Sequence, residues 1–181
     1  MKTSSSSPAF PIAAIVHAER GIVDALLADF AFELRQEGRR VRGLVQQVRG
    51  AGKAGTVLVD LADGVSYPLF QDLGPASAAC AIDAGGIADA SAALRRALFE
   101  GAALVDLVVV NRFGALEANG GGFADEMLAL MAEGVPLLTV VADDYLLDWR
   151  SFTGRAGVEL APALDALRNW FAGVRRTAEC A

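Results

Sequence analysis

The sequence predicts an α/β protein: a three-layer sandwich with a mostly parallel sheet into which a β-hairpin is inserted. Two observations carry this prediction. The first is an apolar run, Ala103–Val110, which Asp106 alone interrupts and which is typical of a strand buried on both faces of a parallel sheet. The second is the alternation of short apolar runs with amphipathic helical patterns along the chain, which favours right-handed parallel connections.

The first third of the chain predicts two strands and a helix. Residues Pro11–His17 form a short apolar run that is typical of a strand, and Val41–Val48 form another. Between them, an amphipathic pattern that ends at Gly38 predicts a helix. Its buried face is expected to contain Val23, Leu27, Phe30 and Leu34, which recur at steps of three and four. Three neighbours widen this face: Ile22, Leu26 and Ala31.

A β-hairpin is predicted next, because two strand-like runs, Thr56–Leu61 and Ser66–Phe70, flank an Asp-Gly pair at residues 63 and 64. We expect this antiparallel ribbon to be inserted into the parallel sheet. The segment 71–86 that follows it is long and irregular. Loops of this length inside a compact domain are usually functional or disordered.

The second half of the chain repeats the alternation of strands and helices. Its central strand, Ala103–Val110, ends in a polar turn that starts at Asn111. Ligands of open α/β sheets bind beyond the carboxyl ends of the strands, so the loops after Val16, Val110 and Val141 define the candidate edge. The other predicted elements are helices over 87–100, 123–133 and 146–152, a strand over 136–141 and a last helix whose apolar stripe runs from Leu160 to Val174.

Composition bounds the class of protein. The chain has 181 residues, of which 54% are hydrophobic, and this predicts one α/β domain over 11–176 after a serine-rich, disordered tail over 1–10. A net charge of −6 without a concentrated basic stretch argues against nucleic acid as a partner. A homo-oligomer is compatible with the sequence.

The expected location is the cytoplasm. No apolar run approaches the roughly 18 to 20 residues that cross a bilayer, so we expect no membrane insertion. Cys80 and Cys180 are far apart and lack metal-ligand spacing, which fits free thiols in a reducing compartment.

The loop after the first strand occupies the place of a P-loop but lacks its chemistry. A P-loop needs convergent glycines, a Lys that reaches the terminal phosphates and a Ser or Thr for Mg²⁺. The segment from His17 to Asp24 keeps Gly21 and has neither Lys nor Ser/Thr. The central strand ends in Asn111, where an acid that holds the metal would be expected. These substitutions predict that the protein does not hydrolyse nucleotides.

Several segments of the chain together form a recognisable pattern: AIVH, RVRGLVQQ, DLADG, QDLGPASAACAID, LVVVNRFGALEANG, GVPLLTVV and LLDWRSF. Over roughly Ile12 to Phe152, this pattern resembles that of a bacterial family, domain of unknown function 2478. Residues that match the family pattern are Asp72, Gly74, Ser77, Cys80, Asp83, Asn111, Phe113, Gly114 and Glu117. The chain departs from the pattern at Arg112 and Ala115, where lysines are common. The resemblance implies a sheet like that of P-loop nucleoside-triphosphatases and genes beside those for molybdate transport, but no settled activity.

Two segments supply the candidate ligand-binding residues. The Asp72–Cys80 loop offers backbone N–H groups and a hydroxyl, as oxoanion loops do, although Asp72 and Ser77 could instead satisfy their own backbone. In the turn after the central strand, Arg112 could clamp an oxoanion or form a surface salt bridge with Glu117 or Glu19. The candidates are Asp72, Gly74, Ser77, Asn111, Arg112, Gly114, Glu117 and His17.

The function that these features favour is a non-hydrolytic, P-loop-like protein that binds a small anion, an oxoanion such as molybdate or a phosphate-containing ligand. No catalytic residue, metal ligand or cofactor is assigned. One alternative is a divergent nucleotide-dependent phosphotransferase or nucleoside-triphosphatase in which Asp143, Asp144 or Glu117 holds the metal. The other is a protein-binding accessory factor of a transporter or of a cofactor-maturation enzyme.

Overall fold

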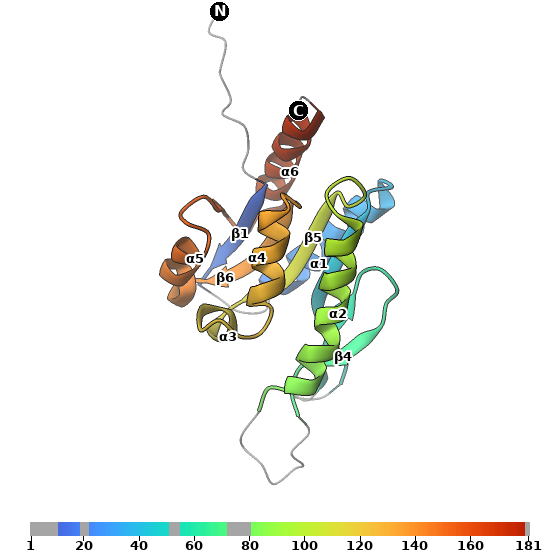
Figure 1. The fold of residues 1–181 in the computed structure, drawn as a ribbon, viewed down its shortest axis with the longest axis vertical. Helices are drawn as coiled ribbons and strands as arrows, with labels where there is room; N and C mark the ends of the chain where they lie inside the picture. Colours follow the sequence, from blue (N-terminus) through green and yellow to red (C-terminus); the bar gives the residue numbers. More distant parts are fainter. Residues whose placement is uncertain (1–10, 19–21, 51–54, 72–80, 180–181) are drawn as a thin grey trace, which may run out of the picture.

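The computed structural model describes residues 11–18, 22–50, 55–71 and 81–179, and the predicted tail over 1–10 lies outside them (Figure 1). The strands are β1 (Ile12–His17), β2 (Val41–Val48), β3 (Thr56–Asp60), β4 (Ser66–Pro68), β5 (Leu107–Phe113), β6 (Leu137–Ala142) and β7 (Val158–Leu160). The helices are α1 (Ile22–Gln36), α2 (Ala84–Glu100), α3 (Ala115–Ala118), α4 (Ala124–Ala132), the 3-10 turn η2 (Asp143–Tyr145), α5 (Leu146–Phe152) and α6 (Leu164–Glu179).

Within the described residues, the strands form one seven-stranded sheet in the order β4-β3-β2-β5-β6-β1-β7. The pairs β2–β5, β5–β6, β6–β1 and β1–β7 are parallel. The pairs β2–β3 and β3–β4 are antiparallel. The mostly parallel sheet that the sequence predicts is therefore confirmed.

Two hydrophobic cores fill the space between the sheet and its helices. Val109 and Leu138 face the core that α1 and α6 cover, which contains Phe30 and Phe171. Val108 and Leu137 face the other core, which α2, α4 and α5 cover. Figure 1 looks onto the α2 and α4 side of the sheet, with α1 behind it. The helices on both faces explain why the central strands are apolar along nearly their whole length.

Some predicted boundaries are wrong. The central strand begins at Leu107, and Asn111 lies within it, because the run before Leu107 forms the connection from α2. α2 begins at Ala84 rather than at Ile87. Asp83 caps it there, because its carboxylate accepts a hydrogen bond from the backbone N–H of Gly86 at 2.9 Å. Leu160 lies in β7 and not in the last helix.

The predicted hairpin is confirmed, and the structure adds its position. β3 pairs with β2 and continues the sheet outward to β4, so the antiparallel ribbon forms one edge of the sheet. Ile22 is 75% exposed, although its neighbours Val23 and Leu27 are buried, because the helix has only begun there. No helix in the described ranges is long and apolar enough to span a membrane.

Candidate functional site

Three central strands end together at the carboxyl edge of the sheet. Val141 of β6 aligns with Val16 of β1 on one side and with Phe113 of β5 on the other. His17, the last residue of β1, is 6% exposed and aligns with Ala142. The carboxyl ends of these strands therefore lie side by side, as the sequence predicts for the candidate edge.

A polar cluster joins β5 to the beginning of α1 at this edge. The Nδ2 amide of Asn111 donates to Asp24 Oδ1 at 3.0 Å. Nη2 of Arg112 lies 2.9 Å from both Oδ1 and Oδ2 of the same carboxylate. We call these three residues, Asp24, Asn111 and Arg112, the carboxyl-edge cluster. The sequence suggests Glu117 or Glu19 as an alternative partner of Arg112; within the described residues the ion pair of Arg112 is with Asp24, and Glu19 lies outside them.

The donors of the carboxyl-edge cluster converge on one point. Two nitrogens, one from an amide and one from a guanidinium, lie at 3.0 and 2.9 Å from Asp24 Oδ1. The side chains of Arg112 and Asp24 are 27% and 14% exposed, so the ion pair is only partly open to water. Charge-assisted hydrogen bonds in such surroundings are stronger than neutral ones. The cluster is thus a small site that holds a negatively charged oxygen.

Part of the hydrogen-bonding capacity of this cluster is unused. Asn111 is 2% exposed, and its Oδ1 has no hydrogen-bond partner among the described residues. Within the same part of the chain, Arg112 uses only Nη2, and its Nε and Nη1 make no hydrogen bond. Buried polar atoms are normally paired, so an unpaired amide oxygen beside a half-used guanidinium is typical of a place that receives a ligand or water.

Glu117 has a different role at the same edge. Its Oε2 accepts from the backbone N–H of Gly114 at 3.0 Å, and its Oε1 accepts from that of Phe123 at 3.1 Å. A side chain at Gly122 would overlap Glu117 Oε1, so glycine is required there. Burial raises the pKa of Glu117, while the backbone hydrogen bonds act in the opposite direction. The carboxylate therefore organises the turn that contains Gly114, around α3.

Phe113 belongs to the core, although it lies next to the carboxyl-edge cluster. It is 1% exposed and packs edge-on against Trp149, with ring centroids 5.4 Å apart, and against Phe152 at 5.1 Å. A hollow of about 180 Å³ lies beside these rings and is also lined by Ala118, Asp148 and Ser151. The aromatic cluster fixes α5 against the end of β5 and so fixes the position of Arg112 one residue earlier.

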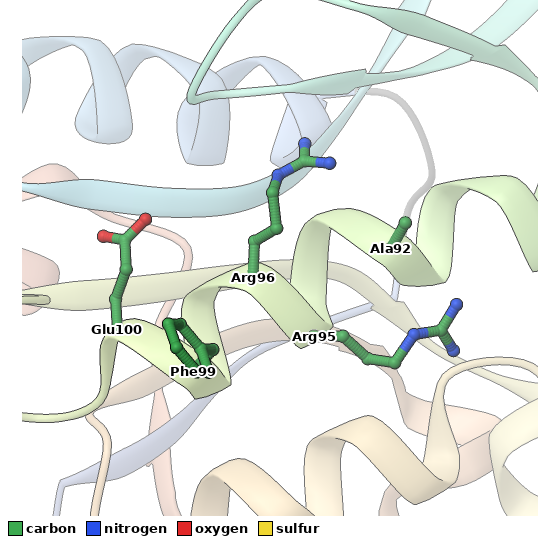
Figure 2. A pocket seen from close by; sticks show the side chains of 5 residues that line it. All are labelled: Ala92, Arg95, Arg96, Phe99 and Glu100. Carbon is green, nitrogen blue, oxygen red and sulfur yellow. The ribbon is translucent and has the colours of Figure 1, made fainter.

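A larger hollow, about 390 Å³, lies on the outer face of α2 (Figure 2). It surrounds Phe99, which is 94% exposed, and Figure 2 shows Arg95 and Arg96 leaving the helix in different directions. Both arginines are paired: Arg95 with Glu126 at 2.9 Å and Arg96 with Asp60. This hollow therefore lacks the available polar groups of the carboxyl edge.

The remaining predicted residues divide into two groups. Asp72, Gly74, Ser77 and Cys80 lie outside the described residues, so their predicted contribution stays a prediction. Asp143 and Asp144 lie in η2, where neither is buried. Among the described residues, no group of three or more His, Cys, Asp or Glu side chains is arranged to hold a metal ion.

Sequence reasoning missed Asp24. The helical pattern leaves this acid outside the predicted buried face of α1, where a polar residue needs no partner. The available signal was an acid in the first turn of the helix that follows the first strand, a position where the helix dipole favours negative charge. Its partners Asn111 and Arg112 are far away in sequence, so the pattern could not identify them.

The fold is an α/β sandwich similar to that of P-loop nucleoside-triphosphatases. A human cancer-related nucleoside triphosphatase superposes with a TM-score of 0.64 at 15% identity, covering 93% of this chain and 96% of that one. The crystal structure of THEP1 from the hyperthermophile Aquifex aeolicus gives a TM-score of 0.63 at 15% identity, covering 84% and 90%. At this identity the similarity concerns the fold alone.

The chain belongs to the family described as protein of unknown function (DUF2478), whose model matches residues 12–170. The resemblance inferred from the sequence is thereby confirmed. A relative is the molybdenum import ATP-binding protein ModC 2 of Bradyrhizobium diazoefficiens, which is 38% identical over 163 residues. That match covers 88% of this chain but only 18% of the relative, so the chain corresponds to a small part of it.

Proposed function

We propose that this protein is a non-hydrolytic, P-loop-like module that binds a small oxoanion at the carboxyl edge of its sheet, in a molybdenum-linked context. The single observation that carries the proposal is the convergence of Asn111 Nδ2 and Arg112 Nη2 on one carboxylate oxygen, at 3.0 and 2.9 Å. Two donors that already hold one anionic oxygen are suited to hold an oxygen of a tetrahedral oxoanion.

Local donors have to supply the attraction. The net charge of −6 gives no overall field that would draw in an anion. A guanidinium offers a planar fork of N–H donors, and the fork of Arg112 is anchored at the end of a core strand. Ser77 and the backbone of the 72–80 segment are the further donors that the sequence suggests, and Gly114 gives the turn a small residue beside the fork.

Molybdate is the first candidate because of the relative's name. A protein that shares 38% identity with this chain is named as a molybdenum import ATP-binding protein. Molybdate is a tetrahedral dianion and so matches the chemistry of the carboxyl-edge cluster. Sulfate, tungstate and phosphate have the same shape, and the choice among them is made by experiment.

The expected lack of hydrolysis follows from the residues around the first loop. In the segment from His17 to Asp24, an acid stands at the beginning of the helix and no Lys or Ser/Thr is present. Asp24 would repel the phosphates that a P-loop attracts, and Asn111 lacks the negative charge that favours Mg²⁺. We therefore expect no turnover of ATP or GTP at rates typical of enzymes.

Titration calorimetry tests the proposal. The purified protein is titrated with molybdate, tungstate, sulfate, phosphate, ATP and ADP, and Mg²⁺-dependent release of phosphate from ATP and GTP is measured in parallel. We expect binding of at least one oxoanion and no turnover. Binding of none at millimolar concentration would contradict the proposed ligand class. Magnesium-dependent hydrolysis that a substitution in the 18–24 loop abolishes would instead support the phosphotransferase alternative.

A further inference from the structure

In the structure, the cation of the proposed site is already paired with a carboxylate of the same chain. Asp24 receives Nη2 of Arg112 on both of its oxygens, at 2.9 Å, and the amide of Asn111 on one of them. Nη2 belongs to the guanidinium edge that a tetrahedral oxoanion would grip with two parallel hydrogen bonds. The Asp24 carboxylate therefore occupies the place that an oxoanion would take at this edge of the guanidinium.

We propose that Asp24 is an internal counter-ion of the anion site, which competes with the oxoanion for Asn111 and Arg112 and turns away when the oxoanion binds. This inference rests on the proposed function, and it adds how the affinity and selectivity of that site are set. The two donors that now hold Asp24 are transferred to the ligand, so the number of charge-assisted hydrogen bonds is conserved during the exchange.

The surroundings of Asp24 allow this exchange. Asp24 lies in the first turn of α1, and its side chain is 14% exposed, so it already borders water. Among the described residues, Arg112 is its only ion-pair partner. Asn111 Oδ1 makes no hydrogen bond there, so the side-chain hydrogen bond that Asn111 makes to Asp24 is the one through Nδ2. The rest of the β5 backbone remains held by the sheet.

The competition between Asp24 and the ligand favours ligands with two negative charges. A carboxylate tethered beside the guanidinium has a high effective concentration, so a free monoanion that makes the same contacts competes poorly. A tetrahedral dianion brings a second charge and further oxygens to Nε and Nη1 of Arg112, which make no hydrogen bond to any described residue. The ligand class that this site favours is therefore the divalent oxoanion, in preference to acetate, formate or chloride.

The test compares the wild type with Asp24→Asn by titration calorimetry with molybdate, sulfate and acetate. The asparagine side chain of this variant has nearly the same shape as the aspartate and carries no charge. Removing a unit charge a few ångströms from the ligand should tighten oxoanion binding on the order of tenfold. The preference for sulfate over acetate should become smaller in the variant.

The matched control is Glu33→Gln, which removes another carboxylate of α1 from an arginine pair. Glu33 binds Arg168 at 2.7 Å on the surface, away from the carboxyl-edge cluster. Its variant should bind oxoanions as the wild type does. If Asp24→Asn folds poorly, as shown by circular dichroism and thermal melting, Asp24→Ser replaces it, because serine is small, polar and uncharged. The same tightening is expected.

The outcomes separate this inference from the proposed function. Tighter binding in the Asp24 variant than in the wild type, including binding by the variant alone, supports the internal counter-ion. Equal or weaker binding in the variant, with a wild type that binds, overturns the counter-ion and leaves the oxoanion site standing. Binding by neither protein overturns the oxoanion site and, with it, the counter-ion.

Discussion

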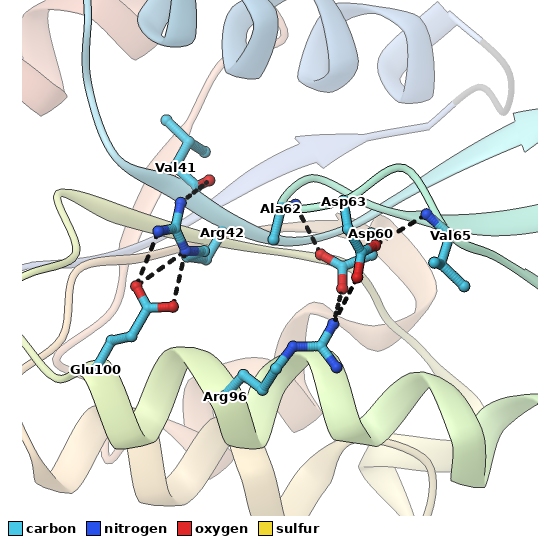
Figure 3. A network of polar contacts seen from close by, with 8 residues as sticks. All are labelled: Val41, Arg42, Asp60, Ala62, Asp63, Val65, Arg96 and Glu100. Atoms are coloured by element: carbon cyan, nitrogen blue, oxygen red, sulfur yellow. Dashed lines mark hydrogen bonds and ion pairs between the residues drawn. The ribbon is translucent and has the colours of Figure 1, made fainter.

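Two regions of this molecule pair arginines with carboxylates, and they differ in how many of their polar groups have a hydrogen-bond partner. The first is the carboxyl-edge cluster. The second, which we call the hairpin network, joins β2, β3 and the β3–β4 turn to α2 and consists of Arg42, Asp60, Asp63, Arg96 and Glu100 (Figure 3). In the hairpin network every carboxylate is matched by donors; in the carboxyl-edge cluster an amide oxygen and part of a guanidinium have no partner among the described residues.

The hairpin network is structural. Asp60 is 1% exposed, and its Oδ1 accepts from the backbone N–H of Ala62 at 2.8 Å while its Oδ2 pairs with Arg96. Arg42 binds both oxygens of Glu100, at 3.1 and 3.0 Å through Nε. Figure 3 shows these side chains bridging α2 and the strands. An arginine pair whose carboxylate is buried, as that of Asp60 is, fixes two elements together, whereas the carboxylate of the Asp24–Arg112 pair borders water and can exchange for another anion.

The largest expected effect comes from breaking the hairpin network. Asp60→Ala should lower the free energy of unfolding by about 2 to 3 kcal/mol, because it removes a buried, charge-assisted pair and leaves the N–H of Ala62 without its acceptor. Urea denaturation measures this loss. The matched control is Asp63→Ala, since Asp63 is 48% exposed and lies 3.4 Å from the same Arg96. It should cost about 1 kcal/mol or less.

Breaking the carboxyl-edge cluster should affect oxoanion binding more than it affects the free energy of unfolding. Arg112→Ala should weaken oxoanion binding by about 1.5 to 3 kcal/mol, roughly 10- to 150-fold, because it removes the charged donor. Its effect on unfolding should be smaller than that of Asp60→Ala, since the Arg112–Asp24 pair is partly exposed. Calorimetric titration and urea denaturation of one protein preparation measure both. An Arg112→Ala protein that binds oxoanions as the parent does would remove Arg112 from the site.

Ser77→Ala should have a smaller effect on the same binding. A neutral hydroxyl donor contributes about 1 kcal/mol, roughly fivefold in the dissociation constant. Titration with the same oxoanion measures it, with Ser91→Ala as the control, because Ser91 bonds within α2 to the carbonyl of Ile87. A loss for Ser77→Ala that exceeds that for Arg112→Ala would place the main donor in the 72–80 segment.

The smallest expected effect is a change in acid sensitivity. The hydrogen bond and charge of Arg168 hold the pKa of Glu33 below its ordinary value of 4.5, so this pair stabilises the fold at neutral pH and its contribution is lost as the pH falls through the lowered pKa. Below about pH 4.5, the melting temperature of Glu33→Gln should therefore depend less on pH than that of the wild type. Glu117 acts with the opposite sign, because its raised pKa makes its ionisation costly as the pH rises above 4.5. Equal pH dependence of melting in the two proteins, measured from about pH 3 to 7, would contradict the role of the Glu33–Arg168 pair.

Much of the fold was predictable from apolar patterning. The runs that became β1, β5 and β6, and the stripe of α1, are long enough for burial to determine their structure. β7 and α3 were missed because three or four residues carry too little periodicity. The edge position of the hairpin depends on which strand β3 meets, and a hairpin signal contains no information about its neighbours.

The candidate site was predictable only in part. The end of the central strand indicated Asn111 and Arg112, and the structure places both at the carboxyl edge. The pairing of Arg112 with Asp24 was not predicted, because an ion pair between residues so distant in sequence depends on how α1 lies across β5. Glu117 was expected as a ligand residue, and its two backbone hydrogen bonds became visible only with the turn from Gly114 to Phe123.

The most direct test of the central claim is a crystal of the protein grown with molybdate and measured near the molybdenum absorption edge, where anomalous scattering locates the metal. We predict a molybdenum peak whose oxygens lie within hydrogen-bond distance of Arg112 and Asn111, with the Asp24 carboxylate turned away from them. A molybdate bound elsewhere on the protein, while the Asp24–Arg112 pair remains closed, would contradict the account.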